Sequence, residues 1–160
     1  MRAVIQKVTS ASVTVDKKLV SSIGNGLMVL IGVCVDDTET DVDFIVNKVL
    51  KLRLFQAEAA GAEAEAPHWK RNVAEVKGEV LCVSQFTLLA KTSKGTKPDF
   101  HYAAKGDHAR SLYDLAVERI GSGLGRDRVQ TGVFGAMMQV ALVNDGPVTI
   151  EISSKKSEQI

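Results

Sequence analysis

The chain has 160 residues, of which 45% are hydrophobic and 24% are charged, and its formal net charge is +1. This composition is typical of one folded domain with its own core, and it excludes a strongly basic nucleic-acid-binding protein but not a local basic patch. The two cysteines, Cys34 and Cys82, lie within apolar runs, so we expect free thiols rather than a disulfide framework. The sequence has no run of eighteen apolar residues and no secretory signal pattern at its start, so we expect a cytoplasmic protein with no membrane partner.

The first 35 residues predict three strands. Residues 3–8 and 12–16 nearly alternate apolar and polar side chains, which is the period of a strand with one buried face. A Gly-Asn-Gly turn at 24–26 precedes a continuous apolar run at 27–35. The run predicts a strand that is buried on both faces.

The next segment changes to a helical period. The apolar positions that fall on one helical face are Val42, Ile45, Val46, Val49 and Leu52. Thr38 and Asp41 have the spacing of a capping box, so we predict that a helix begins just after Thr38.

Residues 56–72 are small, acidic and low in complexity, and we expect a mobile insertion loop over 57–70 because little large apolar surface is available for burial. Residues 72–86 then predict a hairpin that turns at Lys77 and Gly78. Its second strand ends in four residues that form the first candidate site, namely Ser84, Gln85, Phe86 and Thr87.

The second half of the chain predicts one more helix and two more strands. The helix at 106–120 follows a basic loop, and its apolar face is formed by Ala109, Leu112, Leu115, Ala116 and Ile120. A glycine-rich connection then leads to strands at 133–143 and 148–152, which flank the sequence Asn-Asp-Gly-Pro. We expect residues 153–160 to be a flexible tail.

The order of these elements predicts the fold class. Short connections between neighbouring strands favour an α+β fold with a mostly antiparallel sheet or open β-barrel and two main helices packed on it. A doubly wound sheet would require a regular alternation of strands and helices, which the sequence lacks. We therefore predict a single domain over residues 1–152.

Two features that suggest common binding motifs have simpler explanations. The sequence Gly-Ser-Gly-Leu-Gly at 121–125 follows a helix and precedes a strand, which is the reverse of a dinucleotide-binding loop, so it predicts a helix end. His68, His101 and His108 lack metal-ligand spacing and predict surface histidines, so we expect no metal and no other cofactor.

The basic residues fall into two loops, one with Lys91, Lys94 and Lys97 and the other with Arg126 and Arg128. If the fold brings the two loops together, they could contact one phosphate backbone. The alternative is that these side chains are simply solvated.

Two short stretches carry the sharper signals. The residues at 84–87 are either a capped strand end or a polar corner whose backbone N–H groups stabilise an oxyanion. Pro147 follows Asn144, Asp145 and Gly146 at the entry to a strand, where a residue without an N–H is unfavourable.

Five stretches together resemble the D-aminoacyl-tRNA deacylase family. They are MRAVIQKV at the start, VSQFTL at 83–88, KGTKPDF at 94–100, TGVFGAMMQV at 131–140 and NDGPVT at 144–149. The resemblance covers residues 1–152, and relative to shorter members of the family the segment 57–66 is an insertion.

The resemblance implies a homodimer that hydrolyses the ester joining a D-amino acid to tRNA. It implies that Ser84, Gln85, Phe86 and Thr87 line the pocket for the aminoacyl-adenosine end. It also implies that Gly146 and Pro147 share a cis peptide bond and reach into the partner's active site. Further residues are expected on the adenine side, namely Ala109, Phe134 and Met138.

The physics of such a selectivity filter can be stated separately. D- and L-amino acids carry identical groups, so a site separates them only by where the side chain points, and this requires a rigid wall. A proline with fixed φ and a high barrier to peptide rotation supplies one. Glycine has no side chain to reject, so hydrolysis of glycyl-tRNA, including glycine mischarged on tRNA(Ala), is also expected.

For catalysis the sequence leaves two routes open. Thr87 could act as a nucleophile, but neither motif offers an adjacent base except Asp145, so we favour water assisted by the terminal 2′-OH of the tRNA. The family usually has arginine at position 7, where it holds the turn together with residues such as Asn144, whereas this chain has Lys7, which lacks the bidentate fork. The alternative function is a non-catalytic RNA- or DNA-binding module on the same fold.

Overall fold

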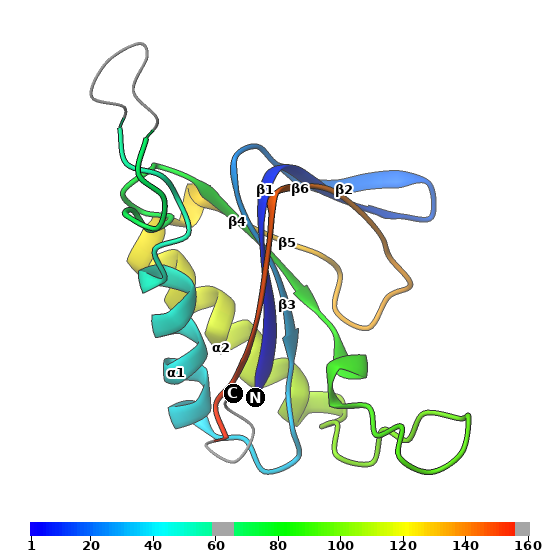
Figure 1. The fold of residues 1–160 in the computed structure, drawn as a ribbon. Helices are drawn as coiled ribbons and strands as arrows, with labels where there is room; N and C mark the ends of the chain where they lie inside the picture. Colours follow the sequence, from blue (N-terminus) through cyan, green and yellow to red (C-terminus); the bar gives the residue numbers. More distant parts are fainter. Residues whose placement is uncertain (59–65, 156–160) are drawn as a thin grey trace.

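The computed structural model describes residues 1–58 and 66–155. Within these residues, six strands, two α-helices and two short 3₁₀ helices follow one another (Figure 1). Their bounds are β1 (Arg2–Val15), β2 (Lys18–Ile23), β3 (Gly26–Gly32), α1 (Glu39–Lys51), β4 (Glu79–Ser84), η1 (Phe86–Leu89), α2 (Gly106–Leu124), η2 (Arg126–Arg128), β5 (Val129–Thr131) and β6 (Gln139–Ser153).

The sheet is organised around the long strand β1. This strand pairs antiparallel with β2, β3 and β6, while β3, β4 and β5 pair parallel to one another. The path from β2 to β5 curls back on itself, because the Ser21 hydroxyl on β2 donates a 2.7 Å hydrogen bond to the Thr131 carbonyl on β5. The result is a mixed sheet that nearly closes into a barrel, which confirms the predicted α+β class.

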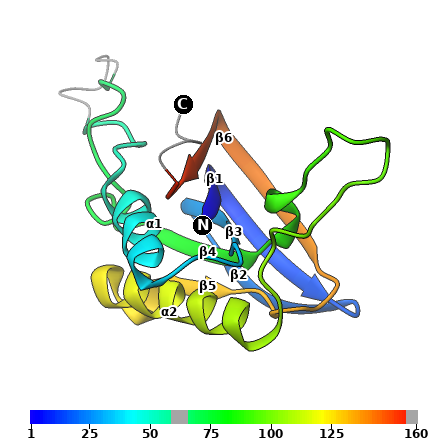
Figure 2. The same cartoon turned by 90° about the horizontal axis from the view of Figure 1, so that it is seen from below.

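The two helices lie side by side on one face of the sheet (Figure 2). The larger core cluster fills the space between them and the sheet, with Val29 of β3, Cys82 of β4, Ile45 of α1 and Ala116 of α2 all fully buried. On the opposite face, a second cluster that includes Met28 and residues of β4 fills the interior of the curled sheet. Strand β3 is therefore buried on both faces, as predicted.

Both predicted helices are confirmed. At the start of α1 the Thr38 N–H donates a 2.9 Å hydrogen bond to the Asp41 carboxylate, so the predicted capping residues do cap it. The predicted apolar face of α2 is buried apart from Leu115, which is only partly covered. This helix ends at Gly125, whose φ is 110°, so the glycine-rich stretch is a helix end and not a phosphate-binding loop. In the part of the chain that the structure describes, neither helix is long and apolar enough to cross a membrane.

The predicted hairpin over residues 72–86 is wrong. Strand β4 runs parallel to β3, and α1 lies in the connection between them, which is the arrangement of a β-α-β unit. The segment before β4 is a turn in which Val73 is buried and its carbonyl accepts a 2.9 Å hydrogen bond from Gly78. Its alternating apolar residues imitate a strand because a turn that packs one side chain into the core has the same pattern.

The last part of the sheet also differs from the prediction. The expected strands at 133–143 and 148–152 form a single strand, β6, which begins only at Gln139 and pairs with β1 on both sides of an interruption at residues 145–148. The short strand β5 was not predicted, because three residues are too few to show a period.

Both predicted flexible segments lie partly outside the described residues. Of the insertion loop, residues 59–65 are not described, and its flanks are joined where the Phe55 N–H donates to the Arg71 carbonyl at 3.0 Å. In the predicted tail, Ser153 closes β6 and the Ser154 hydroxyl donates a 2.6 Å hydrogen bond to Asp41, while residues 156–160 are not described.

The Asp41 carboxylate joins the start of α1 to the end of β6, and this contact predicts a pH effect. Partial burial acts to raise its pKa, but hydrogen bonds from Ser154 and from the Thr38 N–H, together with the nearby N-terminal ammonium and Lys155, lower the pKa to about 2. Because the folded pKa lies below the unfolded one, this stabilisation is complete above about pH 4 and disappears as the pH falls through 2.

We expect Asp41→Asn to remove about 2 kcal/mol of the free energy of unfolding at pH 5 and almost none at pH 2. Urea unfolding at pH 5, 3 and 2 measures the difference. Asp43→Asn is the matched control, since it removes a carboxylate on the same helix that is 65% exposed. Equal losses at all three pH values for Asp41→Asn would contradict the assignment.

Candidate functional site

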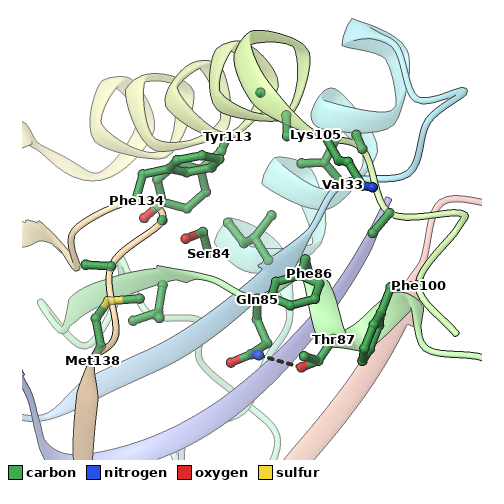
Figure 3. Close-up of a pocket in the computed structure, with 18 of the residues that line it drawn as sticks. Val33, Ser84, Gln85, Phe86, Thr87, Phe100, Lys105, Tyr113, Phe134 and Met138 are labelled. Carbon is green, nitrogen blue, oxygen red and sulfur yellow. Dashed lines mark hydrogen bonds between the residues drawn. The ribbon is translucent and has the colours of Figure 1, made fainter. Parts of the chain in front are cut away.

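A cavity of about 820 Å³ lies at the edge of the sheet where β3 and β4 end (Figure 3). Its walls come from the ends of these strands, from η1, from the loop before α2, from the first turns of α2, and from the segment that leads into β6. The lining is mostly apolar. Segments distant in sequence meet here because parallel strands place their carboxyl ends at one edge of a sheet.

The cavity brings together seven of the residues that the sequence singled out. These are Ser84, Gln85, Phe86, Thr87, Ala109, Phe134 and Met138. Four other predicted residues do not line it, namely Lys7, Asn144, Gly146 and Pro147. The two signature motifs therefore lie in different places within one chain.

The corner at 84–87 forms where β4 passes into η1. The Gln85 N–H donates a 2.8 Å hydrogen bond to the Ile31 carbonyl and so ends the β3–β4 ladder. Gly32 follows on β3, and a Cβ there would lie 2.9 Å from the Gln85 carbonyl oxygen and 2.5 Å from Leu89 Cδ2, so only glycine lets the corner sit this close. The first N–H groups of a helix have no partner within it, which leaves such donors at the start of η1.

The polar groups of this corner are hydroxyls and an amide. The Gln85 side-chain amide donates a 2.5 Å hydrogen bond to the Thr87 hydroxyl (Figure 3). Among the described residues that line the cavity, none carries a carboxylate or an imidazole. Thr87 thus has no carboxylate or imidazole beside it among these lining residues.

On the other side of the cavity, aromatic side chains form a shelf. The Tyr113 and Phe134 rings lie 5.6 Å apart between centroids (Figure 3). The Arg110 guanidinium lies 5.8 Å from the centre of the Phe134 ring. The buried Tyr113 hydroxyl donates a 2.9 Å hydrogen bond to the Cys82 carbonyl, and desolvation raises the pKa of Tyr113, so it remains a neutral donor. A shelf of this kind suits a flat ring.

The lining residues that the sequence did not single out include two aromatic residues and one lysine. Phe100 packs edge-on against Phe86 with centroids 5.1 Å apart, and it is the one aromatic residue of an otherwise polar stretch. Tyr113 interrupts the apolar face of α2 with a hydroxyl, which was a usable signal. Lys105 precedes α2 in a loop of many polar residues, and nothing in the sequence distinguishes it.

The Asn-Asp-Gly-Pro stretch is not a hairpin but a wide bulge within β6. Gln6 pairs with Thr149 and Val8 pairs with Asn144, so two steps along β1 correspond to five along β6. Gly146 and Pro147 are exposed there, and their peptide bond is cis, as the resemblance implies.

Several contacts hold this bulge. Lys7 forms a 2.8 Å ion pair with Asp145, and its side chain is only 15% exposed. The Asn144 side chain accepts from the Val148 N–H at 3.3 Å and donates to the Thr149 hydroxyl at 2.9 Å. Gly146 has a φ of 123°, and a Cβ there would lie 2.9 Å from the Val148 nitrogen, so the position requires glycine.

The remaining candidates lie away from the cavity. The three histidines are exposed, and within residues 1–58 and 66–155 no group of three or more His, Cys, Asp or Glu side chains is placed to hold a metal. Cys34 and Cys82 are both free, and burial raises the pKa of the Cys82 thiol to about 12. The idea that the two basic loops meet is wrong, because Arg126 and Arg128 follow the far end of α2 from the cavity.

Comparison with known proteins identifies close relatives. The profile of the family described as D-Tyr-tRNA(Tyr) deacylase matches residues 4–153. The D-aminoacyl-tRNA deacylase of Yarrowia lipolytica is 55% identical over 99% of this chain and 100% of its own length, and that of Saccharomyces cerevisiae is 49% identical over 96% and 99%. A solved structure described as "c-Myc DNA Unwinding Element Binding Protein" superposes with a TM-score of 0.89 at 42% identity, covering 97% of this chain and 99% of its own.

Proposed function

Because the chain belongs to the D-Tyr-tRNA(Tyr) deacylase family, a family of hydrolases that act on the ester bond of D-aminoacyl-tRNA, we propose that it proofreads the chirality of aminoacyl-tRNA. The observation that carries the proposal is the meeting of the 84–87 corner with the aromatic shelf in one cavity of about 820 Å³. That volume falls within the usual range for a small-molecule site and accommodates an aminoacyl-adenosine. The substrate also agrees with a cytoplasmic location.

The two sides of the cavity suggest how the substrate lies. The adenine ring packs on the aromatic shelf at Phe134, next to Met138 and Ala109, where apolar surface and a neutral aromatic neighbour favour a flat base. The ester then lies at the 84–87 corner, beside the hydroxyls of Ser84 and Thr87.

The selectivity wall comes from a second copy of the chain. Gly146 and Pro147 are exposed and do not line the cavity of their own chain, so they can act as a wall only in a partner's cavity. In such a homodimer the bulge of one protomer would close the cavity of the other. The α-carbon of a D-amino acid would turn its hydrogen toward the bulge, and the larger side chain of an L-amino acid would not fit in that place. A D side chain would point to solvent, and glycine, with no side chain, would escape rejection.

Lys7 supports this wall in place of the usual arginine. Its ammonium lies 2.8 Å from Asp145 and 5.5 Å from the centre of the Phe55 ring, so a compact cation holds the bulge through one carboxylate. An arginine would make two parallel bonds from a planar fork, so the lysine contact is expected to be the weaker of the two.

Catalysis in this cavity does not require an ionised side chain. With no carboxylate or imidazole among the described lining residues, the tRNA's own 2′-OH is the nearest group that can assist a water molecule. Backbone N–H groups at the start of η1 would then stabilise the oxyanion. Thr87, whose hydroxyl accepts a hydrogen bond from Gln85, serves to position the ester.

A second candidate function is suggested by one comparison. The solved structure at 42% identity is described as a DNA unwinding element binding protein, so a non-catalytic nucleic-acid-binding role on this fold remains a rival. The presence of both signature motifs favours the enzyme. The two functions differ in a direct assay of ester hydrolysis.

We expect purified protein to release tyrosine from D-tyrosyl-tRNA at least about a hundredfold faster than from L-tyrosyl-tRNA, because the wall excludes the L side chain. Release of labelled amino acid measures both rates. Glycyl-tRNA is the internal control and should be hydrolysed, since the wall has nothing to exclude. Binding of tRNA without D-selective hydrolysis would favour the rival.

We expect Thr87→Val to lower kcat by about tenfold, because it removes one hydrogen bond at the ester and leaves the Gln85 amide unpaired. Loss of a covalent nucleophile would instead cost about 10⁴-fold or more. Single-turnover hydrolysis of D-tyrosyl-tRNA distinguishes the two. Trapping of an acylated Thr87 in the wild-type protein would overturn the water mechanism.

We expect Lys7→Met to lower the ratio of D- to L-tyrosyl-tRNA hydrolysis by about tenfold, because removal of a mostly buried cation leaves Asp145 unpaired and loosens the bulge. Lys7→Arg should keep the ratio or raise it. Light scattering verifies that each variant remains a dimer. An unchanged ratio in a dimeric Lys7→Met protein would show that the ion pair does not support the wall.

A further inference from the structure

We propose that three lysines beside the cavity, Lys94, Lys97 and Lys105, bind the phosphate backbone of the tRNA strand that leaves it. We call these residues the basic rim. This inference rests on the proposed function, which places the terminal adenosine in the cavity. It adds a second binding surface outside the cavity that recognises phosphate and not base or amino acid.

The loop that carries Lys94 and Lys97 is closed by backbone hydrogen bonds next to the cavity wall. The Lys91 N–H donates to the Asp99 carbonyl at 2.8 Å and the Asp99 N–H donates back at 2.9 Å, so the intervening residues form the closed tip of a loop. Phe100 then packs on Phe86 within the cavity wall. The loop projects from the body of the protein in both views (Figures 1 and 2), so a strand leaving the cavity can reach it without crossing the protein core.

The charged residues of this loop differ in whether they have a partner in the protein. Lys91 lies 3.9 Å from the centre of the Tyr102 ring, and Asp99 is paired with His101 at 2.5 Å. Lys94 and Lys97 are exposed, and within the described residues neither has a carboxylate within 4.0 Å. They are available for an outside anion.

Lys105 continues this positive surface into the cavity. Apart from the neutral Tyr113, it is the one ionisable side chain among the described residues that line the cavity, and Figure 3 shows it on the wall beside Val33. A cation on an otherwise apolar wall has no partner there among the lining residues. An aminoacyl-adenosine within a tRNA carries a phosphate on its 5′ side, and that phosphate supplies one.

The other basic cluster does not compete for this role. The Arg128 guanidinium donates to the Leu124 carbonyl and, at 3.5 Å, to the Gly78 carbonyl. Its donors are therefore used within the protein, where they hold two backbone segments together. Arg126 lies beyond the far end of α2, whose 19 residues span roughly 28 Å. A short single-stranded end held in the cavity therefore meets the rim first.

Lysines suit this task because each is a compact point charge that binds phosphate without reading sequence. Each phosphate contact also releases counterions. The logarithm of the binding constant therefore falls linearly with the logarithm of the salt concentration, with a slope of roughly 0.7 to 0.9 per contact. This gives the rim a signature that a merely structural role would not have.

The test compares Lys94→Gln/Lys97→Gln with a control of equal charge, Lys51→Gln/Arg126→Gln, whose two residues are exposed and do not line the cavity. KM is measured for D-tyrosyl-tRNA and for D-tyrosyl-adenosine, which has no phosphate. We expect the rim variant to raise KM for the tRNA only. The ratio of its KM to the wild-type KM should fall by roughly tenfold between about 50 and about 200 mM salt. The control should behave as wild type.

Lys105→Gln provides the second arm. It should raise KM for a D-tyrosyl trinucleotide that ends in CCA by a larger factor than it raises KM for D-tyrosyl-adenosine. Equal losses on the phosphate-free substrate, or a rim variant that matches the control, would overturn the proposal. If the wild-type protein hydrolyses neither substrate, the proposed function fails instead, and the rim is judged by fluorescence anisotropy with uncharged tRNA and the same variants.

Discussion

The parallel pairing of β3 with β4 is the interaction on which the rest of the site depends. The ladder runs from Gly26 opposite Glu79 to Ile31 opposite Ser84, and the Gln85 N–H extends it by one more bond to the Ile31 carbonyl. This last bond sets the point where the chain leaves the sheet and turns into η1. The helices cover one face of the two strands and the curled sheet covers the other, and the corner opens at the edge where the cavity lies.

The absence of acidic and imidazole groups among the described lining residues has a consequence for mechanism. A site without an ionised base must obtain its rate from position, from backbone donors and from the substrate itself. Rigid geometry then matters more than side-chain chemistry, and close contacts constrain both the 84–87 corner and the bulge of β6. Gly32 and Gly146 both sit where a Cβ would collide with backbone, and Tyr113 is fastened to the Cys82 carbonyl from within the core.

Much of the fold could be predicted from local pattern. Helix α1 has both a capping pair and a clear apolar face, and each is a local property that survives any tertiary arrangement. The errors occurred where local pattern and tertiary structure diverge. The turn before β4 alternates like a strand because Val73 fills the core, and β5 is too short to show a period, although its parallel neighbour makes it a strand.

The candidate site divides in the same way. Sequence alone determined which residues are the candidates for the site, because the motifs around Ser84 and Pro147 are contiguous and their residue types are specific. Only the tertiary structure decided which of them share a cavity, since the 84–87 corner and the turn at Gly146 and Pro147 lie on different strands and do not meet within one chain. It also separated the two basic loops, which the sequence left free to meet, by placing the full length of α2 between them. The physical reason is that a motif is fixed by covalent neighbours, whereas a cavity is fixed by strand register and helix packing.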